Sequence, residues 1–277
     1  MQPLPLGFSP CPNDTFIFHA LVHGLVDTSG HTFRERLEDV ETLNRLVLAG
    51  ELDVSKISYG LLGYVREEYV LLRAGGALGR GCGPLLVARE EMAVEELRGK
   101  RIAVPGRYTT AFLLLRLRDP ALDNFLFLPF HEIMPAVVRG EADAGLIIHE
   151  SRFTYPDYGL VRLLDLGEWW EGSTGHPIPL GGIVAKRSLG QETVAAIDRA
   201  LTASVAYAFA HPDAATPYIR AHAQEMSDEV CAAHIGLYVN DFSRDLGPEG
   251  ESAVIDLLGR AEAAGLVPAS SLDLFAP

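Results

Sequence analysis

Short apolar segments alternate with helix-forming segments along the chain, and this alternation constrains the fold most strongly. Residues 4–8 (LPLGF) and 101–104 (RIAV) are typical of buried strands. Asp14 or Thr15 is the expected N-cap of the helix after the first strand. Strands that alternate with helices predict an α/β protein whose parallel sheets are built from βαβ units. The further helices expected here cover residues 40–50 and 133–139 and begin near residue 109 or 110.

A weak internal repeat divides this pattern in two. Residues 46–54 read LVLAGELDV, and residues 137–144 read VVRGEADA. In both copies a helix end is followed by Gly-Glu, a further apolar residue and an aspartate, Asp53 or Asp143. One copy is an ordinary helix–loop–strand connection, but two copies predict two similar lobes.

The chain has two short apolar segments at which it could cross between the lobes. These are LLVA at residues 85–88 and GIVA at residues 182–185. We therefore expect lobe one to contain residues 1–88 and 186–277, and lobe two to contain residues 89–185. Two connecting strands would form a hinge beside an interlobe cleft, and the helical segments after residue 193 would pack on lobe one.

Composition excludes several classes of partner. The 277 residues carry a formal net charge of −14, which argues against nucleic acid and against an anionic membrane surface. The N-terminus has no basic segment before an apolar one, and no run of 18 apolar residues occurs, so we expect a cytoplasmic protein. The three cysteines are scattered and the histidines lack metal-ligand spacing, so we expect no disulfide and no metal site.

Two polar segments follow predicted strands and are candidates for ligand binding, because ligands of open α/β sheets bind at the carboxyl ends of the strands. In SPCPNDT the candidates are Ser9, Asn13 and Asp14, although a turn and a helix cap would explain the same residues. Cys11 has no basic neighbour in sequence, so a catalytic thiol is not expected. In SKISY alternation along a strand places Lys56 and Ser58 on one face, where a lysine beside a hydroxyl suits an anionic ligand, although a solvated lysine in a loop would explain the same residue.

Two further segments carry residues suited to anion binding and to proton transfer. Thr109 and Thr110 open a helix, and the free N–H groups of a helix N-terminus attract a carboxylate or phosphate. His149 ends the apolar strand GLIIH, where an imidazole could act as a general base in the cleft. A structural role is expected for the other histidines considered, which are His131, His176, His211, His222 and His234.

Four segments of the chain together resemble the 1,4-dihydroxy-6-naphthoate synthases of the futalosine route to menaquinone. They are LGFSPCPNDTF (residues 6–16), DVSKIS (53–58), GLIIHE (145–150) and PLGG (179–182). The resemblance implies a two-lobed fold like that of type II periplasmic binding proteins. It also implies a lyase that acts on cyclic dehypoxanthine futalosine, a small aromatic carboxylate, without a cofactor.

The resemblance assigns the proton-accepting role to His149, and substrate contact to Ser55, Lys56, Ile57, Thr109 and Thr110. Two other functions remain open for such a chain. One is a solute-binding protein of the same fold without catalysis. The other is the sister enzyme of the pathway, which dehydrates chorismate.

Overall fold

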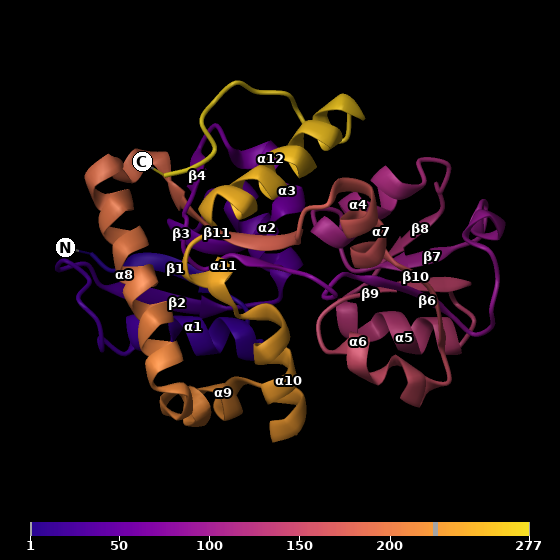
Figure 1. Cartoon of the computed structure of the whole chain (residues 1–277), viewed down its shortest axis with the longest axis horizontal. Helices are drawn as coiled ribbons and strands as arrows, with labels where there is room; N and C mark the ends of the chain where they lie inside the picture. The colour runs from indigo at the N-terminus through magenta and orange to yellow at the C-terminus, as the bar shows by residue number, and fades with distance from the viewer. Residues whose placement is uncertain (1, 224–226, 277) are drawn as a thin grey trace.

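The strands of the chain form two mixed β-sheets that lie side by side, each covered by helices (Figure 1). The computed structural model describes residues 2–223 and 227–276. No helix in these residues combines the length and hydropathy that a membrane-spanning segment needs. The elements are β1 (Leu4–Phe8), α1 (Pro12–Val22), β2 (Phe33–Leu37), α2 (Val40–Leu48), β3 (Val54–Ser58), α3 (Tyr59–Val65), β4 (Tyr69–Leu71), β5 (Ala77–Gly79), β6 (Leu85–Ala88), β7 (Ile102–Val104), α4 (Thr110–Arg118), β8 (Phe125–Phe127), α5 (Phe130–Val138), β9 (Ala144–Ile147), α6 (Ser151–Thr154), β10 (Val161–Asp165), α7 (Leu166–Thr174), β11 (Ile178–Lys186), α8 (Gln191–Ala210), α9 (Thr216–His222), α10 (Asp228–Tyr238), α11 (Asp241–Arg244) and α12 (Gly247–Ala263).

The two sheets share one strand arrangement. The first has the order β2-β1-β3-β11-β4, with β5 also paired to β11, and the second has the order β10-β6-β9-β7-β8. In each sheet three strands are parallel, β2-β1-β3 or β8-β7-β9, and the next strand runs antiparallel to them. This arrangement confirms the predicted α/β class with two similar halves.

The sequence repeat corresponds to equivalent positions in the two halves. Helices α2 and α5 are each followed by a glycine with positive φ, +72° and +76°. The Asp53 N–H then donates to the carbonyl of Pro5, and the Asp143 N–H donates to that of Arg101, at 3.0 and 2.8 Å. The aspartates therefore enter β3 and β9 through the same hydrogen bond to the neighbouring strand segment.

The two apolar segments at the expected crossings lie in different sheets from those expected. Residues 85–88 were expected in lobe one, and residues 182–185 in lobe two. Residues 85–88 form β6, which pairs with β9 and β10 of the second sheet. Residues 178–186 form β11, which pairs with β3, β4 and β5 of the first sheet. A short run of apolar residues does not encode which sheet it joins, because only its hydrogen-bond partners decide this. The division of the whole chain into lobes stays a prediction.

The C-terminal helices pack differently from one another. Helix α8 packs against α1, where the Ser204 hydroxyl accepts from the Leu21 N–H at 3.0 Å and donates to the Ile17 carbonyl at 2.6 Å (Figure 1). Helix α12 contacts both β11, a strand of the first sheet, and α4, the helix that follows β7 of the second sheet. The expectation that the C-terminal helices pack on lobe one therefore describes α8 but not all of α12.

Helix α1 begins earlier than expected. Its N-cap is Cys11, and Pro12 occupies the first helical position, where its missing N–H costs nothing. Asp14 does not cap the helix, because its carboxylate forms an ion pair with Lys56 of β3, with Asp14 Oδ1 2.9 Å from Lys56 Nζ.

Helices α2 and α3 both contact the segment before α4, and so help to join the halves beside the cleft between them. The buried carboxylate of Glu41 in α2 accepts from the N–H groups of Arg107 and Tyr108, at 3.0 and 3.2 Å. At Gly60 in α3 an added Cβ would lie 2.7 Å from the carbonyl oxygens of Tyr108 and Thr109. The close approach of these backbones therefore requires glycine at position 60.

We expect Gly60→Ala to separate the halves, because backbone atoms cannot move aside as a flexible side chain can. The free energy of unfolding should fall by about 1–3 kcal/mol, the usual cost of overpacking. Gly259→Ala is the matched control, since Gly259 also lies in a helix and has no atom within 4 Å of its added Cβ. It should gain about 0.5–1 kcal/mol from helix propensity. Chemical denaturation and small-angle scattering measure both effects, and a Gly60→Ala protein as stable and compact as the control would contradict this account.

Candidate active site

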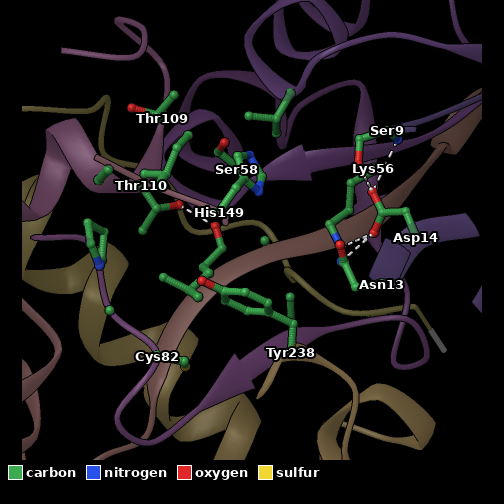
Figure 2. Close-up of a pocket in the computed structure, with 18 of the residues that line it drawn as sticks. Ser9, Asn13, Asp14, Lys56, Ser58, Cys82, Thr109, Thr110, His149 and Tyr238 are labelled. Atoms are coloured by element: carbon green, nitrogen blue, oxygen red, sulfur yellow. Dashed lines mark hydrogen bonds and ion pairs between the residues drawn. The ribbon is translucent and has the colours of Figure 1, made fainter. Parts of the chain in front are cut away.

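A cleft between the two halves brings together most of the predicted site residues (Figure 2). Residues at the carboxyl ends of β1, β3 and β9 and at the N-terminus of α4 line it. The predicted residues that line it are Ser9, Asn13, Asp14, Lys56, Ile57, Thr109, Thr110 and His149.

Ser55 is the exception among the predicted residues, because it does not line the cleft. It is fully buried, and its hydroxyl donates to the Lys56 carbonyl at 2.8 Å. Its neighbour Ser58 lines the cleft beside Lys56, as strand alternation places it. The Ser58 hydroxyl oxygen lies 3.2 Å from Asn44 Nδ2, which donates to it.

A buried ion pair organises one side of the cleft. Lys56 Nζ lies 2.9 Å from Asp14 Oδ1. The other carboxylate oxygen accepts from the Ser9 hydroxyl at 2.7 Å and from the Ser9 N–H at 3.1 Å. Burial alone would raise the pKa of Asp14, but Lys56 and Ser9 hold it below its ordinary value. Asp14 therefore stays ionised and fixes the loop after β1.

On the opposite side, both predicted threonines already use their hydroxyl hydrogens within the protein. The Thr109 hydroxyl donates to the Gly106 carbonyl and caps α4 by accepting from the Phe112 N–H. The Thr110 hydroxyl donates to the Leu180 carbonyl at 2.6 Å and accepts from Gly60. No described residue accepts from the N–H of Thr110 or Ala111. The donors available to an anion here are therefore backbone N–H groups rather than hydroxyls.

His149 has an uncommon backbone conformation at the end of β9. Its φ is +57°, a left-handed value that costs free energy in a residue with a Cβ. The imidazole Nδ1 lies 3.9 Å from the Cys11 sulfur, and Phe130 packs edge-on against the ring. With this backbone conformation, two residues after β9 ends, the His149 side chain lines the cleft.

Burial also sets the protonation of the groups around His149. It lowers the pKa of His149 below the ordinary 6.5, although the nearby carboxylates of Glu150 and Asp14 partly oppose this. Burial raises the pKa of Cys11, so its thiol stays protonated. The imidazole that lines the cleft is therefore neutral, and so is the thiol 3.9 Å from it, which suits proton abstraction and not nucleophilic attack by sulfur.

The cleft also contains residues that the sequence reasoning missed. His234 and Tyr238 come from α10, where they share the buried face with Cys231. Their spacing on one helix face was the available signal. The structural role expected for His234 stays a prediction, and the structure adds that this residue lines the cleft. Arg152, also missed, lines the cleft while its guanidinium pairs with Asp165 at 2.7 Å.

The cleft is small in this structure. Its volume is about 80 Å³, below the roughly 300–1,000 Å³ of typical small-molecule sites. This volume is small for a substrate with fused rings. Among the described residues, no group of three or more His, Cys, Asp or Glu side chains could hold a metal ion.

Comparison with known proteins agrees with this architecture. A family profile described as menaquinone biosynthesis matches residues 4–263. A crystal structure of an Archaeoglobus fulgidus protein superposes with a TM-score of 0.88 at 39% identity, covering 96% of this chain and 98% of that one. A Candida albicans protein described as having the generic periplasmic binding protein fold matches with a TM-score of 0.71 at 15% identity, covering 98% and 92%. The predicted fold is confirmed.

Two curated relatives carry the same name, 1,4-dihydroxy-6-naphthoate synthase. The one from Thermus thermophilus is 56% identical, covering 99% of this chain and 100% of its own length. The one from Streptomyces coelicolor is 50% identical, covering 99% and 98%. The resemblance seen in the sequence is thus confirmed, and the chain belongs to the menaquinone biosynthesis family, among the 1,4-dihydroxy-6-naphthoate synthases.

Proposed function

We propose that this enzyme converts cyclic dehypoxanthine futalosine to 1,4-dihydroxy-6-naphthoate, with His149 as the base that starts bond cleavage. The observation that carries the proposal is the neutral imidazole held in the cleft by a left-handed backbone. The names of the two curated relatives supply the product, and the resemblance supplies the substrate.

The substrate carboxylate binds at the N-terminus of α4 in this proposal. The N–H groups of Thr110 and Ala111 have no acceptor among the described residues, and both residues line the cleft. The partial positive charge of the helix N-terminus adds to these hydrogen bonds. Lys56 is a weaker candidate for this role, because Asp14 already neutralises its ammonium group.

His149 then removes a proton from carbon. Its Nδ1 lies against the Cys11 thiol, so Nε2 is the nitrogen that meets the substrate. The electron pair left on carbon drives the cleavage that releases the sugar-derived fragment and lets the second ring become aromatic. The carboxylate of Glu150, next in the chain, stabilises the imidazolium that forms.

Closure of the halves completes the site. Contacts at Glu41 and Gly60 join the two halves beside the cleft, and closure excludes water from the reacting carbon. In this proposal the halves open before substrate entry and product release, because the cleft volume is only about 80 Å³. A cytoplasmic location and the absence of nucleic-acid partners stay predictions.

Incubation with the substrate tests the proposal directly. Purified protein is mixed with cyclic dehypoxanthine futalosine, and the product is followed by mass spectrometry, with chorismate in a parallel reaction. Formation of dihydroxynaphthoate supports the proposal. Turnover of chorismate would identify the sister enzyme instead, and binding without turnover would identify a solute-binding protein.

We expect His149→Asn to fold normally and to lose at least about 100-fold in kcat, the low end for removal of a general base. Asn is the right replacement because it tolerates the left-handed φ of +57° better than most residues. Single-turnover kinetics isolate the chemical step, and thermal melting checks the fold. A variant that reacts near the wild-type rate would show that His149 is not the base.

The pH profile should follow the lowered pKa of His149. The base works only when neutral, so kcat/KM should fall as the pH drops through a value below 6.5 and stay level above it. In Glu150→Gln this fall should move to still lower pH, because the carboxylate raises the pKa of His149. An acidic limb centred above 6.5 in the wild type would argue against this assignment.

Removing Lys56 should affect stability more than substrate contact. Lys56→Met leaves the Asp14 carboxylate buried without its partner, which typically costs about 3–5 kcal/mol. The double variant Lys56→Met with Asp14→Asn should recover much of this loss, because no unpaired charge remains. Urea denaturation measures both variants. A single variant as stable as the wild type would mean that the pair does not form in solution.

A further inference from the structure

His234 is a second imidazole in the cleft, and the proposed reaction does not use it. It lies in α10, has no solvent-exposed surface, and lines the same cleft as His149. The two rings are nearly parallel, inclined by 16°, with their centroids 6.2 Å apart. Any molecule that reaches His149 from the cleft is therefore close to His234.

A chain of hydrogen bonds determines which ring nitrogen of His234 carries the proton. The ionised Asp14 can only accept, so the Asn13 group 2.9 Å from it must be the amide NH₂. The Asn13 carbonyl oxygen then faces His234 Nε2, also at 2.9 Å. A carbonyl oxygen has no hydrogen to give, so Nε2 carries the hydrogen and donates it.

The other ring nitrogen, Nδ1, consequently carries a lone pair and no hydrogen. Burial and, to a smaller extent, the neighbouring His149 lower the pKa of His234 to about 3, so the ring is neutral and has one N–H only. Nδ1 is buried and has no hydrogen-bond partner among the described residues. An unpaired buried acceptor costs free energy unless a ligand satisfies it.

We propose that His234 Nδ1 accepts a hydrogen bond from a hydroxyl group of the bound substrate. A fixed lone pair attracts an O–H group and repels a carboxylate. The substrate therefore places its hydroxyl-bearing, sugar-derived part at α10 and its carboxylate at α4. Because His149 lies close to His234, this orientation presents the sugar-derived part to the base. The identity of the substrate rests on the function proposed above.

Two substitutions separate this role from a structural one. In His234→Gln the amide nitrogen can replace Nε2 and donate to Asn13, but the acceptor at Nδ1 is lost. In His234→Asn the side-chain oxygen replaces Nδ1, but the donor to Asn13 is lost. His211→Gln, at an exposed position after α8, is the control.

We expect His234→Gln to lose roughly three- to tenfold in kcat/KM, the effect of one hydrogen bond between neutral groups, mainly through KM. His234→Asn should lose less, and the control should match the wild type. If His234 only supports Asn13, the order is reversed, and a reversed order or equal losses would overturn the proposal.

The tautomer can be measured without turnover, by NMR of protein labelled with ¹⁵N-histidine, using the His234→Gln spectrum to assign the signal. A protonated Nε2 and bare Nδ1 are expected at neutral pH, and the opposite tautomer would overturn the proposal. This result does not depend on activity. If the wild type leaves cyclic dehypoxanthine futalosine unchanged, the proposed function fails, whereas the tautomer is still decided.

Discussion

The buried ion pair between Lys56 and Asp14 is the interaction on which one side of the cleft depends. It joins β3 to α1, and neither charge is exposed to solvent. Such a pair is stable only when hydrogen bonds satisfy its remaining polar atoms. Ser9 and Asn13 donate such hydrogen bonds to the Asp14 carboxylate. Asn13 is also hydrogen-bonded to His234 in α10. Three elements distant in sequence are thereby fixed around one carboxylate.

The repeated topology explains why a cleft exists at all. Each half is a sheet with parallel strands whose carboxyl ends carry short loops, and such ends are where ligands bind in open α/β sheets. The halves are joined by contacts of different kinds. Glu41 can exchange its N–H partners for water when the halves separate, whereas Gly60 fixes how closely the backbones approach when they meet.

Neutral groups dominate the polar surface of the cleft. The two cations that line the cleft, Lys56 and Arg152, each have an aspartate partner. Burial keeps the imidazoles of His149 and His234 largely uncharged by lowering their pKa values. In the proposed reaction, selectivity therefore arises from lone pairs and helix N–H groups in fixed directions more than from net charge. Such groups act most strongly when closure has removed water.

The sequence by itself determined the class of fold and most of the site. Alternating apolar and helical segments predicted the α/β layers, and the Gly-Glu repeat predicted two halves, because local periodicity and turn chemistry are encoded over a few residues. The strand-ending segments placed Ser9, Asp14, Lys56 and His149 at the cleft for the same reason. Only the tertiary structure decided which sheet β6 and β11 join, why Ser55 faces away while Ser58 lines the cleft, and that His234 is a cleft residue. These outcomes depend on hydrogen bonds and packing between segments far apart in the chain, and a pattern of a few neighbouring residues does not specify such contacts.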